Sequence, residues 1–269
     1  MLIWVSALHC EARPVIEYYR LKKSHQDRAF EIYRGDDMVC VISGIGKLAS
    51  AAASAWIAAR YQHEASLAWI NLGVAGAAQH DIGTIFQLNK IVDADSGQSY
   101  YPAPTSTPKL AGNTCLTLSQ PGYDYRDDCL FDMEASGFIC SALRFSSAEL
   151  IRSLKIVSDN RREQTGRNRQ QVSDLIRQHI ESIDHQARDL IALDSEIAAL
   201  EISPESWQRL ITMAHFSQTQ KNRLRVLWRY LSNRDLSSES LLQKLAILDS
   251  AGAIIEALEQ ISFTDSETL

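Results

Sequence analysis

The chain has 269 residues, 45% of them hydrophobic and 22% charged, which is typical of a globular protein large enough to bury its own core. Its net charge of −6 excludes a general electrostatic attraction to nucleic acid or to an anionic membrane. Five scattered cysteines without CxxC spacing argue against a zinc site, so we expect no metal and no cofactor. Their odd number, with no signal-peptide or membrane-span pattern, favours the reducing cytoplasm.

The first half of the chain alternates apolar runs typical of strands with helical segments. Leu2–Ala7 is an apolar run followed by a loop that holds Glu11, whereas Ala29–Tyr33 and Met38–Ser43 flank a charged turn and predict a hairpin. An alanine-rich helix then runs to Arg60. Further strands are expected at Leu67–Leu72, Thr84–Val92, Leu116–Leu118, Leu130–Phe131 and Leu154–Val157, and a helix at Ala135–Leu143. This alternation predicts an α/β fold whose ligands bind beyond the carboxyl ends of the strands.

Two stretches depart from the alternation. Residues 96–120 are rich in proline, serine and threonine, so most of this stretch is expected to be a long loop. From Val172 to Ile191 apolar residues recur at the spacing of one amphipathic helix. Ser203-Pro204 starts the next helix, and later helical stripes follow, one of them opening at Ser237 or Ser238. We therefore expect an α/β domain over residues 1–193 and an all-helical extension over residues 194–269.

Six short motifs fall at the predicted strand ends and helix starts. They are Ser43-Gly-Ile-Gly-Lys47, Asn71-Leu-Gly-Val-Ala-Gly76, Ile82-Gly83, Asp93-Ala-Asp95, Asp132-Met-Glu-Ala135 and Val157-Ser-Asp159. In this order they resemble the purine nucleoside phosphorylase/nucleosidase superfamily, nearest to the methylthioadenosine/S-adenosylhomocysteine nucleosidases, over about residues 1–190. The resemblance implies a three-layer α/β/α domain with a mixed sheet, a homodimer, and a nucleoside substrate whose N-glycosidic bond is cleaved.

Three carboxylates have roles in this resemblance that suit the chemistry of that bond. Its cleavage passes through an oxocarbenium-like sugar and leaves negative charge on the base. The resemblance assigns Glu134 to the ribose hydroxyls, with Met133 packing on the sugar. It assigns Asp159 to protonation of the purine, and Glu11 to activation of water. Each carboxylate also has a purely structural alternative. Glu134 is then a carboxylate at a helix start, Asp159 a capping residue, and Glu11 an exposed glutamate in a loop.

Gly73, Val74 and Ser158 complete the predicted substrate-binding set. Gly73 fits a turn at which the backbone approaches a ligand closely. Two positions depart from the family, because Val74 stands where many nucleosidases have a water-holding serine and Lys155 where they often have arginine. Phosphate would also lack the arginine and serine that phosphorylases use, and each missing charged hydrogen bond is worth roughly 1.5 to 3 kcal/mol. Hydrolysis is therefore favoured over phosphorolysis.

The segment between Asp95 and Asp132 is shorter than in the family, and Gln120–Tyr125 is the expected replacement for the part that stacks on the base. The sequence thus predicts a nucleosidase that hydrolyses an adenine-type purine nucleoside. A phosphate-dependent phosphorylase is one alternative. The other is a non-catalytic nucleoside-binding module whose helical tail docks a partner.

Two clusters of basic side chains lie outside these motifs. The first follows Asp159 closely and would attract an anionic group on the substrate; it comprises Arg161, Arg162, Arg167 and Arg169. The second interleaves with an apolar helical stripe of the tail; it comprises Lys221, Arg223, Arg225 and Arg229. This second cluster indicates a solvated helix face or, alternatively, a docking surface for a protein or an RNA. Aromatic side chains are too few there for nucleic acid to be the expected ligand.

Overall fold

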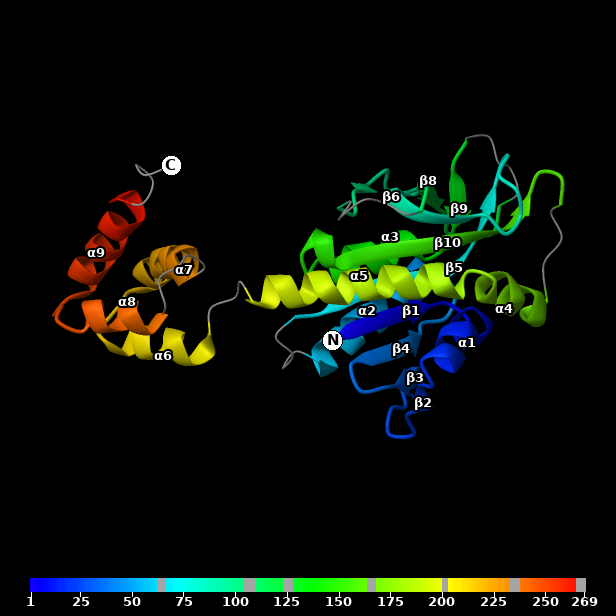
Figure 1. The fold of residues 1–269 in the computed structure, drawn as a ribbon. Coiled ribbons are helices and arrows are strands. Elements are labelled where there is room, and N and C mark those ends of the chain that lie inside the picture. Colours follow the sequence, from blue (N-terminus) through cyan, green and yellow to red (C-terminus); the bar gives the residue numbers. More distant parts are fainter. Residues whose placement is uncertain are drawn as a thin grey trace. The chain divides into compact units, whose positions relative to one another are not determined.

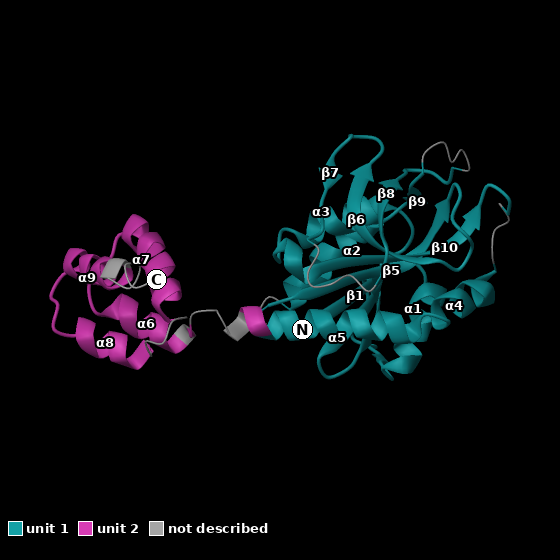
Figure 2. Cartoon of the chain, turned by 45° about the horizontal axis from the view of Figure 1, so that its top comes forward, with its two compact units in different colours: residues 1–195 teal, residues 196–269 magenta. Residues whose placement is uncertain are grey.

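The computed structural model describes residues 1–61, 66–103, 110–122, 128–163, 168–199, 203–232 and 238–264. The chain divides into two compact units, Met1–Ser195 and Glu196–Leu269, which Figure 2 shows in separate colours. Within the described residues, no helix has both the length and the apolar character that a membrane span requires. The first unit is an α/β domain and the second is all-helical, as the sequence predicts.

Strands and helices alternate along the first unit (Figure 1). The strands are β1 (Leu2–Ser6), β2 (Lys22–Lys23), β3 (Glu31–Arg34), β4 (Met38–Ile42), β5 (Ala68–Ala77), β6 (Ile85–Asp93), β7 (Ser99–Tyr100), β8 (Gly112–Thr117), β9 (Leu130–Asp132) and β10 (Ile151–Asn160). The helices that begin in this unit are α1 (His9–Tyr18), α2 (Lys47–Arg60), α3 (Ala135–Ala142), α4 (Arg169–Arg177) and α5 (Ile180–Ala199), with a short 3₁₀ turn at Ala148–Leu150.

The strands form one mixed sheet that closes on itself at one side. In the open part, β2, β3, β4, β1 and β5 lie in that order, with β1 parallel to both β4 and β5. Beyond β5 the pairings run through β10, β6, β8 and β9 and return to β5, so these five strands make a ring. The long strand β5 belongs to both parts, because it pairs with β1 near its start and with β9 at its carboxyl end.

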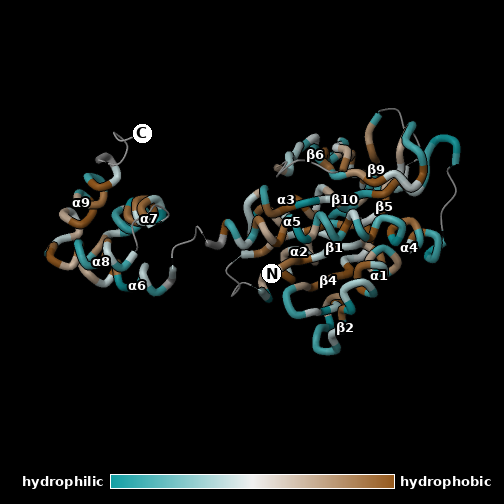
Figure 3. Tube along the Cα trace, viewed as in Figure 1, coloured by the Kyte–Doolittle hydropathy of each residue, from teal (hydrophilic) through white to brown (hydrophobic). Residues whose placement is uncertain are grey.

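Helices cover both faces of the open part. All five residues of β1 are buried, because Ile3 and Val5 join the core beneath α2 and α3 while Trp4 packs against Tyr19, which follows α1. Tyr19 in turn donates a hydrogen bond to Asp184 of α5, which places α5 on the α1 side. Figure 3 shows the contrast between the hydrophobic strand β4 and the hydrophilic outer loop at β2. The predicted three-layer α/β/α architecture is confirmed.

Helix α1 occupies the segment that was expected to be a loop around Glu11. Pro14 lies inside this helix and has no N–H to donate to the carbonyl of Cys10 four residues earlier. The Ser173 hydroxyl of α4 donates to that carbonyl instead, at 2.6 Å. The proline therefore does not end the helix, since the freed acceptor is satisfied by a residue far away in sequence, and the loop prediction is wrong.

Two further expectations are corrected. The stretch 96–120 is not simply a loop, because β7 and β8 lie within it and β8 pairs in parallel with both β6 and β9. The predicted single helix over 172–191 is two helices, α4 and α5. They separate at Gln178–His179, where the His179 ring is hydrogen-bonded to the carbonyl of Gly83. In both cases a long-range contact overrides the local pattern.

The second unit has its own core. Its helices are α6 (Pro204–Thr212), α7 (Gln218–Ser232), α8 (Ser238–Leu245) and α9 (Ala251–Thr264). The side chain of Ser203 caps α6 as predicted, and α8 opens at Ser238, whereas Ser237 lies outside the described residues. Trp228 is fully buried at the centre of this core. Of the basic residues of α7, Arg223 pairs with Glu259, and Arg225 lies over the ring of Trp207 at 5.2 Å.

Candidate active site

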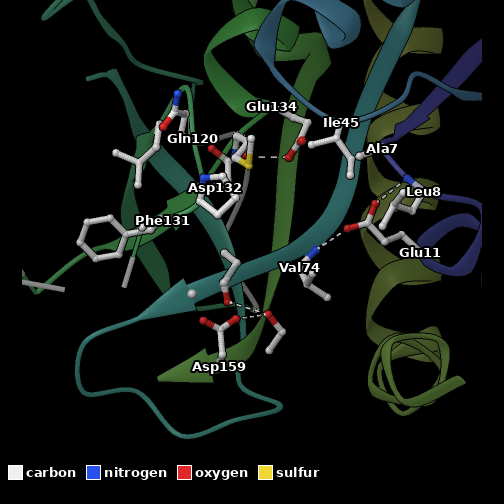
Figure 4. A pocket seen from close by; sticks show the side chains of 17 residues that line it. Ala7, Leu8, Glu11, Ile45, Val74, Gln120, Phe131, Asp132, Glu134 and Asp159 are labelled. Carbon is white, nitrogen blue, oxygen red and sulfur yellow. Dashed lines mark hydrogen bonds between the residues drawn. The ribbon is translucent and has the colours of Figure 1, made fainter. Parts of the chain in front are cut away.

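A cavity of about 230 Å³ opens where the carboxyl end of β10 meets the turns after β1, β8 and β9. Six of the seven predicted site residues line it: Glu11, Val74, Met133, Glu134, Ser158 and Asp159. Figure 4 shows Glu11 beside Leu8 and Val74 on one side of the cavity, with Glu134 and Asp159 apart from it and from each other. Carboxylates from three distant segments of the chain thus face one space.

Glu11 is held rigidly at the start of α1. It is 4% exposed, and each of its two carboxylate oxygens accepts a backbone hydrogen bond, from Leu8 at 2.9 Å and from Val74 at 3.0 Å. Burial raises the pKa of Glu11, and the charge of Lys155 and the backbone N–H groups oppose this rise without cancelling it. A carboxylate offers about four acceptor positions, more than these backbone groups use, which leaves room for a water molecule.

Gly73 lies behind Glu11 and makes room for it. A β-carbon at this position would lie 2.8 Å from Glu11 Oε1 and 3.4 Å from Lys155 Nζ. Gly73 does not line the cavity itself, although the sequence places it in the substrate-binding set. The missing side chain of Gly73 thus allows the Glu11 side chain to approach the backbone of β5. The sequence instead predicts that Gly73 allows the ligand to approach it.

Lys155 forms a buried ion pair that the sequence analysis does not predict. Its ammonium lies 2.8 Å from Asp132 Oδ2, and the residue is only 1% exposed. Burial alone would lower the pKa of Lys155, but Asp132, Glu134 and Glu11 raise it above its ordinary value. Burial alone would raise the pKa of Asp132, yet Lys155 holds it below its usual range. A lysine inside an apolar strand is the signal for such a pair, because buried ammonium groups need a counterion.

Glu134 is positioned by the glycine-rich turn that precedes α2. Its Oε1 accepts a hydrogen bond of 2.8 Å from the backbone N–H of Gly46, which has a φ of 99° that favours glycine. Glu134 precedes the first residue of α3 and is 8% exposed. Burial raises its pKa, with Lys155 opposing the rise. Two motifs more than 80 residues apart are joined by this one hydrogen bond.

Ser158 and Asp159 both reach the cavity because β10 is irregular at this point. The register between β10 and β5 shifts between Val157 and Asp159, so Ser158 is an extra residue in the strand. Side chains of successive residues in a regular strand point to opposite faces, and a bulge re-aims them. Ser158 donates a hydrogen bond of 2.6 Å to Asp159 Oδ1. The half-buried Asp159 is therefore oriented by its neighbour.

The remaining wall is apolar or formed by a loop. Gln120, Pro121 and Gly122 line the cavity after β8, in the segment expected to replace the base-stacking part, whereas residues 123–125 lie outside the described residues. Leu8 and Ile45 also line it, and sequence reasoning gave no signal for either because they carry no polar chemistry. Within the described residues, no cluster of three or more His, Cys, Asp or Glu side chains is placed to hold a metal ion.

The Asp93-Ala-Asp95 motif supports the site from outside the cavity. Lys47 at the start of α2 pairs with Asp93 at 2.7 Å and with Asp95 at 2.6 Å, and Ser136 of α3 donates to Asp93. Burial would raise the pKa of Asp93, but these partners hold it far below its ordinary value. The motif thus fixes the starts of α2 and α3, next to Gly46 and Glu134.

Comparison with known proteins finds similarity in fold but no match by sequence. No protein-family model matches the chain, and no curated protein matches it by sequence. Among solved structures, the 5′-methylthioadenosine/S-adenosylhomocysteine nucleosidase of S. pneumoniae with a transition-state inhibitor is similar at 17% identity and a TM-score of 0.54, over 68% of this chain and 96% of that one. The apo 5′-methylthioadenosine nucleosidase of Arabidopsis thaliana has the same identity and TM-score, over 71% and 94%.

A mutant futalosine hydrolase of Helicobacter pylori is similar at 11% identity and a TM-score of 0.53, over 70% of this chain and 98% of that one. The chain therefore shares the fold of these nucleosidase and hydrolase structures over about 70% of its length, as the resemblance of its motifs predicts. Sequence identities this low establish a shared fold only, so the reaction has to be inferred from the residues of the site.

Proposed function

We propose that this protein is a nucleosidase that hydrolyses the N-glycosidic bond of an adenine-type purine nucleoside. The observation that carries the proposal is the meeting of Glu11, Glu134 and Asp159, from three separate segments, around one cavity. The names of the similar structures agree with it, since two are nucleosidases and one is a hydrolase. We call Glu11, Asp132, Glu134 and Lys155 the sugar end of the site, and Gln120, Ser158 and Asp159 the base end.

In this proposal Glu11 orients and deprotonates the attacking water. Its two hydrogen bonds to backbone N–H groups fix the carboxylate and leave acceptor positions free for the water. A raised pKa makes Glu11 a stronger base than an ordinary glutamate, which favours removal of a proton near neutral pH. Val74 has no hydroxyl to hold the water, so in this proposal Glu11, which accepts the backbone N–H of Val74, positions the water.

Glu134 accepts the ribose hydroxyls, and Asp159 supplies the proton that the departing base takes up. Glu134 is fixed by Gly46 and keeps acceptor positions for two hydroxyl groups. Asp159 is fixed by its neighbour Ser158 on β10, whereas Glu134 lies at the start of α3, so the two carboxylates can act on opposite parts of the substrate. Proton donation of this kind is worth roughly 10²- to 10⁴-fold in rate.

The charge of the cavity favours hydrolysis over phosphorolysis. Glu11, Asp132, Glu134 and Asp159 line it, and none of its described lining residues is Lys, Arg or His. Lys155 lies behind the wall in its ion pair with Asp132. Such a lining stabilises the positive charge that develops on the sugar, whereas it repels a phosphate dianion beside it. Water is therefore the nucleophile in the proposal.

The experiment is a panel of purine nucleosides incubated with the full chain, with and without phosphate, followed by chromatography of the released base. We expect phosphate-independent release of the free base. Glu11→Gln should lower kcat roughly 10²- to 10⁴-fold, because the amide cannot take the proton from water. Strict phosphate dependence would replace the proposal with a phosphorylase. Tight nucleoside binding without release over hours would replace it with a binding module.

A further inference from the structure

A second cavity, of about 400 Å³, lies against the first. The two share the wall residues Ala7 and Leu8, which connect β1 to α1. The second cavity is bounded by the first turns of α1 and α4 and by β3 and β4; besides the shared pair its lining residues are His9, Cys10, Arg13, Glu31, Ile42, Arg169, Gln170 and Ser173. The first cavity alone is small for a ligand site, for which about 300–1,000 Å³ is usual. A substrate that extends past Leu8 can also occupy the space of the second cavity.

The charges of the two cavities have opposite signs. Arg13 and Arg169 line the second cavity, and Glu31 is the one acidic side chain among its described lining residues. Glu31 is already neutralised, because Lys23 lies 2.9 Å from its carboxylate and Tyr33 donates to the same oxygen. Arg13 uses only its Nε on Glu17, which leaves its two terminal nitrogens available. Arg169 therefore gives the space a positive charge, and Arg13, although its charge is paired with Glu17, can still donate from its terminal nitrogens.

The backbone adds to this charge. The amino-terminal turns of both α1 and α4 line the cavity, and the first N–H groups of a helix have no partner in a preceding turn. The N–H of Gln171 already donates to a capping side chain and that of Glu11 to a backbone carbonyl, so only the N–H groups that precede these two can serve a ligand. Those N–H groups and the helix dipole favour an anion at this end. The hydrogen bond from Ser173 Oγ to the carbonyl of Cys10 holds the two helices together, so both starts stay beside the same space.

The position of the second cavity matches one substituent of the proposed substrate. Among the walls of the first cavity that are not assigned to the base or to the ribose hydroxyls, the Ala7–Leu8 side is the one that adjoins the second cavity. A nucleoside bound with its base at Asp159 and its ribose hydroxyls at Glu134 can place a group on its 5′ carbon there. We propose that the second cavity binds an anionic group, a phosphate or a carboxylate, carried on the 5′ carbon of the nucleoside, with Arg13 and Arg169 as its cationic ligands. The location on the substrate rests on the proposed function, whereas the preference for an anion rests on the cavity itself.

The test is calorimetry on the full chain with four probes: adenosine, adenosine 5′-monophosphate, adenosine 5′-carboxylate, and adenosine together with inorganic phosphate. We expect at least one of the two attached anions to bind about tenfold or more tightly than adenosine, because charge-assisted hydrogen bonds are the stronger class. The attached anion with the larger gain in affinity over adenosine identifies the group that the cavity binds. Free phosphate added to adenosine should not reproduce the gain, because the covalent link holds the anion at the cavity.

Arg169→Gln and Arg13→Gln should each reduce this preference by up to about tenfold. Arg144→Gln is the control, since Arg144 is an exposed arginine that does not line the cavity and does not share Glu17, the ion-pair partner of Arg13. Equal binding of adenosine and both anionic forms would overturn the inference, as would an anion preference that survives in both cavity variants. Binding decides this question even where no nucleoside is cleaved, so failure of the proposed hydrolysis remains distinguishable.

Discussion

At the sugar end of the candidate active site, Glu11, Asp132, Glu134 and Lys155 are all buried, whereas Asp159 at the base end is half-buried. The sugar-end carboxylates are fixed by backbone N–H groups of four different segments and by the ion pair with Lys155. The base end depends on a strand bulge and on a loop that begins at Gln120.

The difference in burial indicates that the two ends have separate tasks in the proposed reaction: the sugar end carries out bond cleavage, and the base end selects the base. Cleavage of any N-glycosidic bond needs the same grip on ribose and the same oriented water, so a buried and preorganised network serves every substrate. Recognition of one particular base needs a surface that can vary, and loops supply it. Changes at the sugar end should therefore affect stability together with activity, whereas changes at the base end should affect activity alone.

The largest expected effect is on activity at the base end. Asp159→Asn removes the proton donor but keeps the shape and an acceptor for the Ser158 hydroxyl. We expect kcat/KM to fall roughly 10²- to 10⁴-fold while the melting temperature stays unchanged. Steady-state kinetics and thermal denaturation measure the two quantities. Asp174→Asn, an exposed carboxylate of α4 outside the cavity, should change neither, and equal rates for wild type and Asp159→Asn would exclude Asp159 as the acid.

The next effect is on stability at the sugar end. Lys155→Met leaves the buried carboxylate of Asp132 without its cation, which should lower the free energy of unfolding by about 3–5 kcal/mol. Denaturation in urea measures this loss. The double variant Lys155→Met/Asp132→Asn should recover much of it, because no uncompensated charge remains. A loss below about 1 kcal/mol in the single variant would show that the pair does not organise the sugar end.

Gly73→Ala should give a smaller, mixed effect. The added methyl group meets Glu11 Oε1 at 2.8 Å, and Glu11 can yield only by lengthening its hydrogen bonds to Leu8 and Val74. We expect kcat/KM to fall about 10²-fold from misplacement of the base, and stability to fall by about 1–3 kcal/mol. Gly252→Ala in α9 is the control, since a β-carbon there meets nothing within 4 Å. Unchanged kinetics in Gly73→Ala would mean that the position of Glu11 is not critical.

The same division describes what the sequence can predict. The positions of most strands along the first unit and the three carboxylates follow from apolar runs and from motifs at their ends, where local pattern and function coincide. Helix α1 was missed because Pro14 looks like a helix breaker until Ser173, 159 residues later, supplies the missing donor. Strand β8 was largely missed because its partners β6 and β9 decide its conformation more than its composition does.

The Lys155–Asp132 pair shows the limit of sequence reasoning within the site. The two residues are brought together because β5 lies between β9 and β10 and pairs with both. The spacing of Asp132 and Lys155 along the chain does not predict that β9 and β10 both pair with β5 in this register. The apolar neighbours of Lys155 indicate burial and hence some counterion, but only the fold identifies which carboxylate it is.

The smallest expected effect, the pH dependence of kcat/KM, tests the separation of the two ends most directly. Burial raises the pKa of Glu11 and that of Glu134, and both must be ionised, one to activate water and the other to accept the ribose hydroxyls. As pH falls through these raised values, kcat/KM should therefore decline, with an acid limb at higher pH than an ordinary glutamate gives. The apparent values belong to the interacting pair.

Asp159→Asn should leave the acid limb of Glu11 and Glu134 in place, because Asp159 is not among the groups that shift the pKa of either glutamate. Lys155→Arg should leave the limb almost in place, since it keeps the charge that opposes the rise. pH–rate profiles of the three proteins measure both. A limb that moves in Asp159→Asn would mean that the base end and the sugar end titrate together, and that the reaction and the choice of base are not set by separate parts of the site.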